Sequence, residues 1–219
     1  MSSAAIRFEE VNAGAGRLGR VTLDVAATLN SLTLDMVDQL QAQLESWRGD
    51  PGIAAIFLEG AGEKAFCAGG DVQALYDSVL ATPGGPCEYA ENFFLREYRL
   101  DYTLHTYPKP VVCWGHGIVM GGGLGVMAGC SHRVVTEKTR IAMPEVTIAL
   151  FPDVGGSWFL NHMPGRSGHF LALTGASINA ADAIYTGLAD RFVASEHKQA
   201  VLDALKAVSY THLRAHETF

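Results

Sequence analysis

Short apolar runs alternate with amphipathic stretches along this chain, and this alternation constrains its fold more than any other feature. Residues 53–58 and 111–114 are brief apolar segments close to glycine or proline, which is typical of buried strands. Residues 72–80 and 88–106 have helical patterns, and residues 132–136 return to a strand pattern. Strands that alternate with helices in this way indicate an α/β fold with a partly parallel sheet.

The N-terminal part carries both patterns in turn. Residues 6–25 predict strands that are broken by a loop at residues 12–19. From Thr33 the apolar residues recur at helical spacing, and the glycines and proline of residues 49–52 end that helix. The side chains expected to face the core are Met36, Val37, Leu40, Leu44 and Trp47.

The helix predicted at residues 88–106 is rich in aromatic residues. We expect these residues to form its apolar, core-facing side. They are Tyr89, Phe93, Phe94, Tyr98 and Tyr102, followed by His105.

Two glycine-rich turns, at residues 68–71 and 121–123, each follow a strand-like segment and precede a predicted helix. Glycine lets a ligand approach the main chain, and the first N–H groups of the following helix are unpaired and positively biased. Such donors can stabilise an oxygen that becomes negative during a reaction, by about 3 kcal/mol per donor. Neither turn matches the dinucleotide-binding or phosphate-loop fingerprints. From spacing alone, oxyanion donors and simple packing turns both remain open.

Composition argues against several classes of partner. The formal net charge of −7 disfavours nucleic acid, which requires a basic surplus, and the apolar runs are too short to cross a bilayer. The 4 cysteines lack C-x-x-C spacing and no histidine pair has metal spacing, so we expect no metal site. The first ten residues lack the apolar region of a secretory signal. We therefore expect a cytoplasmic protein that binds neither nucleic acid nor membranes.

Several stretches of the sequence resemble the crotonase (enoyl-CoA hydratase/isomerase) superfamily in order and spacing. They are residues 64–72, 109–112, 114–123, 142–156 and 170–175. The last two resemble more specifically the 3-hydroxyisobutyryl-CoA hydrolase branch. The resemblance implies an α/β fold built as a spiral of ββα turns, with two packed sheets and flanking helices. It places a single catalytic core in residues 1–207.

The resemblance also implies how a substrate is held. The N–H groups of Gly70 and Gly122 are expected to hold the carbonyl oxygen of an acyl-CoA thioester. Ala68, Asp71 and Glu97 are assigned to substrate binding, although Glu97 beside two arginines also suits a solvated helix charge. Coenzyme A is then part of the substrate, and no separate cofactor or metal is expected.

Acidic residues distinguish the reactions of the superfamily. A hydratase uses two glutamates, and the resemblance places the first at Gly125 and the second at Glu145. Asp153 stands where hydratase-like members carry glycine, and the hydrolase branch has the pair Glu145 and Asp153. Two carboxylates facing one thioester suit hydrolysis, because one can attack or activate water while the other handles a proton.

The resemblance therefore implies hydrolysis of a short 3-hydroxyacyl-CoA, such as the 3-hydroxyisobutyryl-CoA of valine breakdown. Glu145 is expected to be the nucleophile or general base, and Asp153 its acid–base partner. Two alternatives stay open: a hydratase or isomerase that uses Glu145 alone, and an inactive acyl-CoA-binding fragment. Without the resemblance, Glu145 would be interpreted as a surface acid and Asp153 as a turn residue.

The last residues, 208–219, depart from the family pattern and resemble a translated sequencing adapter, so we expect a non-native tail. The hydrolase branch is considerably longer, which predicts a chain truncated at its C-terminus. Its missing helices would cover the acyl pocket and contribute to contacts in a homo-oligomer of the full-length protein. Exposed apolar surface is the expected consequence.

Overall fold

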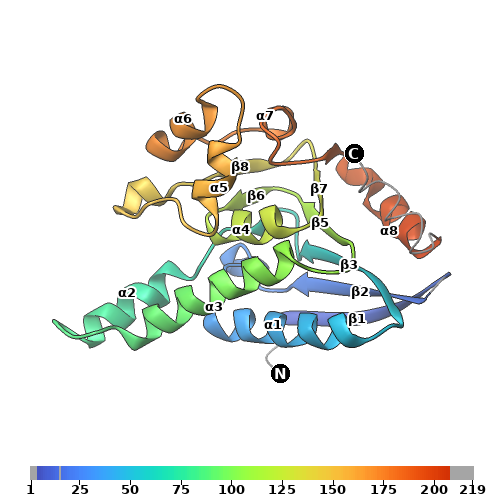
Figure 1. Ribbon diagram of the computed structural model, residues 1–219, viewed down its shortest axis with the longest axis horizontal. Coiled ribbons are helices and arrows are strands. Elements are labelled where there is room, and N and C mark those ends of the chain that lie inside the picture. Colours follow the sequence, from blue (N-terminus) through green and yellow to red (C-terminus); the bar gives the residue numbers. More distant parts are fainter. Residues whose placement is uncertain (1–3, 15, 208–219) are drawn as a thin grey trace.

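The computed structural model describes residues 4–14 and 16–207, whose strands form two sheets (Figure 1). The larger sheet has the order β1-β2-β3-β5-β7-β9, and the smaller one has the order β4-β6-β8. β1 (Ile6–Ala13) and β2 (Gly16–Leu23) are antiparallel, and every later pair of neighbours is parallel. A mostly parallel sheet requires crossover connections between its strands, and these build the rest of the molecule.

The chain alternates between the two sheets. The central strands of the larger sheet are β3 (Ile53–Gly60), β5 (Val111–Gly115) and β7 (His132–Val135). Each is followed directly by a strand of the smaller sheet, namely β4 (Ala65–Cys67), β6 (Ile118–Met120) and β8 (Arg140–Ala142). Helix α2 (Val72–Ala81) follows the first pair and α4 (Gly122–Gly129) the second. These repeated ββα turns confirm the predicted α/β spiral with two sheets.

Helix α1 (Leu34–Gly49) begins where the sequence predicts it, with the Thr33 hydroxyl accepting a hydrogen bond from the Met36 N–H. All the side chains of α1 that were predicted to face the core are buried. The predicted loop at residues 12–19 is wrong, because most of those residues belong to β1 and β2, which pair from Ile6↔Leu23 to Ala13↔Gly16. Gly16 and Gly19, which the predicted loop included, lie in β2.

Helix α3 (Glu88–His105) ends one residue before the predicted end and buries only part of the predicted side. Phe93 is buried as predicted, but Tyr98 is 40% exposed and Tyr102 is 68% exposed, so the predicted face is wrong for these two tyrosines. The buried residues are Phe93, Glu97, Leu100, Thr103 and Leu104. This side packs against α1 and against α4, whose glycines allow the two helices to approach closely.

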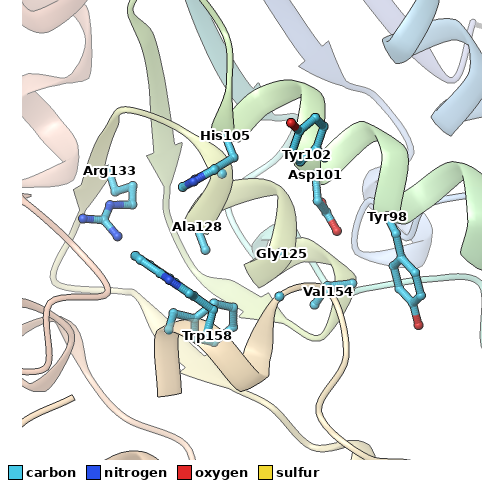
Figure 2. Close-up of a pocket in the computed structure, with 12 residues that line it drawn as sticks. Tyr98, Asp101, Tyr102, His105, Gly125, Ala128, Arg133, Val154 and Trp158 are labelled. Atoms are coloured by element: carbon cyan, nitrogen blue, oxygen red, sulfur yellow. The ribbon is translucent and has the colours of Figure 1, made fainter. Parts of the chain in front are cut away.

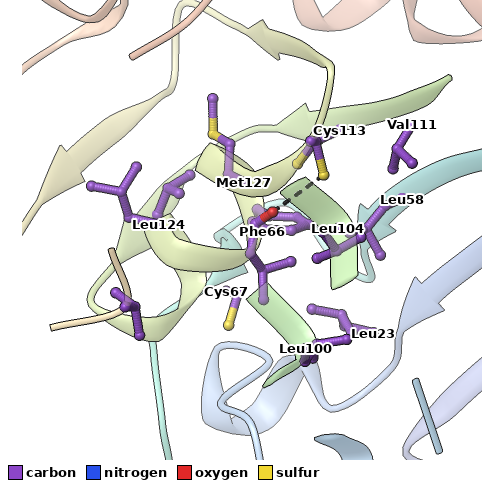
Figure 3. Packing of buried hydrophobic residues seen from close by; sticks show 14 of the residues in the cluster. Leu23, Leu58, Phe66, Cys67, Leu100, Leu104, Val111, Cys113, Leu124 and Met127 are labelled. Atoms are coloured by element: carbon purple, nitrogen blue, oxygen red, sulfur yellow. Dashed lines mark hydrogen bonds between the residues drawn. The ribbon is translucent and has the colours of Figure 1, made fainter. Parts of the chain in front are cut away.

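The two faces of the larger sheet have separate cores. The main core lies on the side of α1 and α3, and Figure 3 shows its centre, where Phe66, Cys67 and Cys113 pack with leucines of several elements. Cys67, Cys113 and Cys130 are buried free thiols. The opposite face, which includes Phe57 and Trp114, packs against α8 (Lys198–Ala207) through Leu202 (Figure 1).

Short elements after β8 complete the described part of the chain. They are η2 (Glu145–Ile148), α5 (Gly156–Asn161), α6 (Ser167–Thr174), α7 (Ala180–Tyr185), β9 (Arg191–Phe192) and η3 (Ser195–His197), with η1 (Ala26–Thr28) near the start. Large apolar side chains are exposed here, as expected, including Phe151, Trp158, Leu173 and Tyr185. Within residues 4–14 and 16–207, no helix is long and apolar enough to cross a membrane. The predicted tail, 208–219, lies outside the described residues.

Candidate active site

The two glycine-rich turns lie against each other. β4 and β6 are parallel neighbours in the smaller sheet, so the turns that follow them emerge at the same edge. A Cβ built on Gly69 would lie 3.4 Å from the Gly122 nitrogen, and one built on Gly122 would lie 3.4 Å from the Gly70 nitrogen. Gly69 and Gly121 have φ angles of 109° and 51°, which favour glycine. The fold therefore brings the predicted donors Gly70 and Gly122 together.

The main-chain N–H groups of these two glycines are available to a ligand. The hydrogen bonds found among the described residues include none donated by the Gly70 or Gly122 N–H. Their neighbours are occupied, because Asp71 N–H donates to the Leu32 carbonyl and Gly121 N–H donates to the Ala142 carbonyl. Two adjacent unpaired donors suit the stabilisation of an oxyanion. This geometry agrees with the predicted role, which remains a prediction.

Both turns border a pocket of about 670 Å³. Most of the residues that the sequence assigned to the site line this pocket. They are Ala68, Gly70, Glu97, Gly122, Glu145 and Asp153. Asp71 is not one of the lining residues, because its carboxylate caps α2 by accepting a hydrogen bond from the Ala74 N–H at 3.1 Å. Substrate contact by Asp71 is thus a prediction that this arrangement does not favour.

Glu145 begins the short 3-10 helix η2 and reaches back to the second glycine turn. It is 6% exposed, and its Oε1 would lie 2.8 Å from a Cβ built on Gly121. Its Oε2 is buried and has no hydrogen-bond partner within the described chain. Burial raises the pKa of Glu145 to about 7, and the nearby charge of Asp153 adds to this effect, while a backbone hydrogen bond opposes it. A carboxyl that titrates near neutral pH suits general acid–base chemistry.

Asp153 lies in the segment before α5 and is held by a residue of α3. The Tyr98 hydroxyl donates a hydrogen bond to Asp153 Oδ2 at 2.8 Å. Burial raises the pKa of Asp153, and the hydrogen bond from Tyr98 opposes this rise by stabilising the charged form. The sequence pattern placed Tyr98 on the apolar side of α3 and indicated no functional role for it. Its position directly after Glu97 was the one available signal.

Glu97 is buried, so the alternative of a solvated helix charge is wrong. It is 2% exposed, and its Oε1 lies 2.1 Å from the place that a Cβ on Gly122 would occupy. This oxygen has no hydrogen-bond partner among the residues that the structure describes. Burial raises the pKa of Glu97 to about 8, with further contributions from the charges of Asp153 and Glu145. An unpaired carboxyl beside the donor turn can contact a substrate, which remains the prediction.

A second, smaller pocket of about 320 Å³ lies between α3, α4 and α5 (Figure 2). Tyr98 lines this pocket and touches Asp153 of the larger one. Asp101, which the sequence analysis missed, also lines it. At Gly125, where the resemblance places the first acid of a hydratase, a Cβ would lie 2.4 Å from the Cβ of Val154. A larger side chain at this position would require Val154 to move.

The polar groups of His116 and Lys109 form contacts outside the larger pocket. The ring of His116 is hydrogen-bonded through Nε2 to the Gly62 carbonyl at 2.9 Å, and the Lys109 ammonium donates to the Trp47 and Asp50 carbonyls at the end of α1. Within the described ranges, no group of three or more His, Cys, Asp or Glu side chains is arranged to hold a metal ion.

Curated relatives match most of this chain but are about twice as long. A chicken protein named "3-hydroxyisobutyryl-CoA hydrolase, mitochondrial" is 44% identical over 180 residues, which cover 82% of this chain and 46% of the relative. The human protein of the same name is 44% identical over 198 residues, which cover 89% of this chain and 50% of the relative. The chain therefore spans about half the length of these relatives.

The names of these relatives correct one expectation. They place the relatives in mitochondria, and the predicted cytoplasmic location is therefore wrong. The physical reason is that free thiols indicate reducing surroundings and do not distinguish one reducing compartment from another.

Solved structures and a family model agree on the fold. An enoyl-CoA hydratase from Rhodobacter sphaeroides is 39% identical with a TM-score of 0.84, and the match covers 91% of this chain and 58% of that one. A carnitinyl-CoA dehydratase from Mycobacterium thermoresistibile is 41% identical with a TM-score of 0.88, and the match covers 97% of this chain and 60% of that one. The model of the family "Enoyl-CoA hydratase/isomerase" matches residues 18–219. This chain belongs to the enoyl-CoA hydratase/isomerase family.

Proposed function

We propose that this chain forms the catalytic core of an acyl-CoA thioester hydrolase that acts on a short 3-hydroxyacyl group. The proposed reaction converts 3-hydroxyisobutyryl-CoA to 3-hydroxyisobutyrate and coenzyme A, a step of valine breakdown. The observation that carries the proposal is that Glu145 and Asp153 border the same pocket as the unpaired N–H groups of Gly70 and Gly122. The names of the relatives, which are 44% identical, support the same activity.

In the proposed reaction, the thioester oxygen lies between the Gly70 and Gly122 N–H groups. Water attacks the carbonyl carbon while Glu145, whose pKa of about 7 leaves it partly ionised at neutral pH, takes the water proton. The two N–H groups stabilise the negative oxygen of the tetrahedral intermediate. The C–S bond then breaks with its electron pair leaving on sulfur, and a proton passes back through the Glu145 and Asp153 pair to the thiolate.

A variant of this route uses Glu145 as the nucleophile. Its carboxylate attacks the thioester carbon and expels the thiolate, which leaves a mixed anhydride that water hydrolyses. In that route Asp153, held by Tyr98, takes the proton of the attacking water. Hydrolysis in H₂¹⁸O under single-turnover conditions separates the two routes, because water can attack the anhydride at the Glu145 carbon and place label in the protein.

A second candidate function is hydration of an enoyl-CoA. It is favoured by the names of the solved relatives, an enoyl-CoA hydratase and a carnitinyl-CoA dehydratase. Against it stands Gly125, which supplies no acid and whose side-chain space is taken by Val154. Hydration would then depend on Glu145 without a second glutamate at that place.

One assay separates these functions. The full-length protein is given 3-hydroxyisobutyryl-CoA and crotonyl-CoA, and free thiol and the absorbance of the conjugated thioester are followed separately. Thiol release from the first substrate without loss of enoyl absorbance from the second supports the hydrolase. Loss of enoyl absorbance without thiol release supports the hydratase, and tight binding without either signal supports an inactive acyl-CoA-binding protein.

The roles of the acids are tested by Glu145→Gln and Asp153→Asn. Each is expected to reduce thiol release by roughly 100-fold or more and to retain acyl-CoA binding, because acid–base groups act on the transition state. Glu91→Gln on the exposed side of α3 is the matched control and should behave as wild type. Near-normal turnover in either acid variant would remove that residue from the mechanism.

A further inference from the structure

Helices α3 and α4 meet through a repeated pairing of carboxyl groups with glycines. Glu97 and Asp101 are four residues apart on α3, and Gly122 and Gly125 are three residues apart on α4, so each pair lies on one side of its helix. A Cβ on Gly122 would lie 2.1 Å from Glu97 Oε1, and a Cβ on Gly125 would lie 3.1 Å from Asp101 Oδ2. Asp101 therefore lies one helical turn beyond Glu97 and contacts Gly125, which lies one turn beyond Gly122 on the same side of α4.

Asp101 carries a buried carboxyl whose hydrogen-bonding capacity is unused. Both of its oxygens are buried, and neither has a hydrogen-bond partner in the described part of the protein. Burial raises its pKa well above the usual range, and the charges of Glu97 and Asp153 act in the same direction. Leaving such a group unpaired is costly, by roughly 1–3 kcal/mol or more. A ligand that pairs with it would remove this cost.

The cations and rings around Asp101 are occupied by other contacts. The Arg133 guanidinium forms two hydrogen bonds to the Asp190 carboxylate, at 3.0 and 2.7 Å. The His105 ring packs edge-to-face against Trp158 with centroids 5.9 Å apart. Figure 2 shows the Asp101 carboxyl pointing toward Gly125 and Val154.

The separation between the two glycines matches the span of a 3-hydroxyacyl group. The helical rise from Gly122 to Gly125 is about 4.5 Å at 1.5 Å per residue. Four covalent bonds separate a thioester carbonyl oxygen from the oxygen of a 3-hydroxyl group, which extends over a comparable length. An acyl chain that ran along α4, with its carbonyl oxygen at the Gly122 N–H, would place its hydroxyl at the level of Gly125 and Asp101.

We propose that Asp101 binds the 3-hydroxyl group of the acyl chain and thereby selects 3-hydroxyacyl thioesters over thioesters without the hydroxyl. This inference rests on the proposed function, in that it takes the carbonyl oxygen to lie at the two glycine N–H groups. The hydroxyl and the Asp101 carboxyl share one hydrogen bond in a buried setting. The side chains of Val154 and Ala128 supply an apolar wall for the carbon chain.

The test compares 3-hydroxyisobutyryl-CoA with isobutyryl-CoA, which differ only in the hydroxyl. In the full-length protein, Asp101→Leu should lower the ratio of the two kcat/KM values by roughly 10- to 100-fold, because the buried hydroxyl of the substrate is left without a hydrogen-bond partner. Asp101→Asn keeps the size and one hydrogen-bonding oxygen, so it should lose less of the ratio. Asp203→Asn on α8, outside both pockets, is the control. If Asp101→Leu does not fold, as judged from its thermal unfolding, Asp101→Ala replaces it.

The inference is overturned by an unchanged ratio of the two kcat/KM values in Asp101→Leu or, where that variant does not fold, in Asp101→Ala. An unchanged ratio that comes with an equal loss on both substrates indicates a structural role alone. Failure of the proposed hydrolysis gives a different result, namely no thiol release from either substrate in the wild-type protein. In that case the same two thioesters are compared by calorimetric Kd. A preference for the hydroxylated one that Asp101→Leu abolishes supports the assignment of Asp101, and its absence refutes it.

Discussion

Tyr98 and Asp153 meet at the boundary between two pockets, where the Tyr98 hydroxyl donates a hydrogen bond to Asp153 Oδ2 at 2.8 Å. Tyr98 lines the smaller pocket and Asp153 the larger one. The ring of Tyr98 packs against Phe94 one turn earlier on α3, with centroids 6.0 Å apart. The contact therefore ties α3 to the segment before α5, and it stabilises the charged form of a carboxyl that burial would otherwise favour as neutral.

Removing this hydrogen bond should change the pH dependence of the reaction. In Tyr98→Phe the pKa of Asp153 should rise, because the contact that opposes burial is lost while Glu97, Glu145 and Asp101 still face it. The acidic limb of the kcat/KM profile, which contains the ionisation of Asp153 beside that of Glu145, should move to higher pH because the hydrogen bond that stabilises the charged form of Asp153 is lost. Tyr185→Phe, at an exposed position on α7, should leave the profile unchanged. An unshifted limb in Tyr98→Phe would show that Asp153 does not control it.

Elements defined by local periodicity could be predicted from the sequence. The apolar residues of α1 recur at helical spacing, and each one predicted to be buried is buried. The brief apolar runs became β3 and β5, and the glycine turns lie at strand-to-helix junctions as expected. These features follow from residues close together in the chain, so a single sequence contains them.

Features that depend on a distant partner could not be predicted in the same way. The buried side of α3 is set by α4, whose glycines admit Glu97 and Asp101, whereas aromatic periodicity pointed to Tyr98 and Tyr102. The assignment of Glu145 and Asp153 came from family resemblance, because nothing local distinguishes them from surface acids. Functional roles for Tyr98 and Asp101 could not be predicted, because their contacts with Asp153 and Gly125 exist only once α3 packs beside the site.

Gly122 should tolerate no side chain while Glu97 is present. A Cβ at this position would lie 2.1 Å from Glu97 Oε1 and 3.4 Å from the Gly70 nitrogen, so Gly122→Ala must displace the carboxyl or the donor turn. We expect thiol release to fall by roughly 100-fold, the size of the effect of losing one oxyanion donor. The double variant Gly122→Ala/Glu97→Ala removes the clash, so its free energy of unfolding should be higher than that of Gly122→Ala. Equal free energies of unfolding for the single and double variants would show that Glu97 does not limit the space at Gly122.

Replacing a side chain by alanine should change the free energy of unfolding much more on the buried side of α3 than on its exposed side. Leu104 is 2% exposed and Tyr102 is 68% exposed, the reverse of what the aromatic pattern predicts for Tyr102. Leu104→Ala should lower the free energy of unfolding by about 2–5 kcal/mol, because it removes buried methyl groups and leaves a cavity. Tyr102→Ala should change it by no more than about 0.5 kcal/mol, as is usual for exposed positions. Urea denaturation of both variants measures the difference, and comparable losses would contradict the observed orientation of the helix.

Glu97 should make the stability of the protein depend on pH. Its pKa is raised from 4.5 to about 8 in the folded protein, so the folded state keeps a proton that the unfolded state has lost. Because only the folded state holds this proton between about pH 4.5 and about pH 8, the free energy of unfolding falls as the pH rises through that range. Glu97→Gln removes this effect, so its stability relative to wild type should increase by roughly 2–4 kcal/mol between pH 5 and pH 8. Glu91→Gln, at an exposed position on the same helix, provides the control. Urea denaturation at several pH values measures the difference, and a constant offset between Glu97→Gln and wild type would show that Glu97 ionises in the folded protein as it does in water.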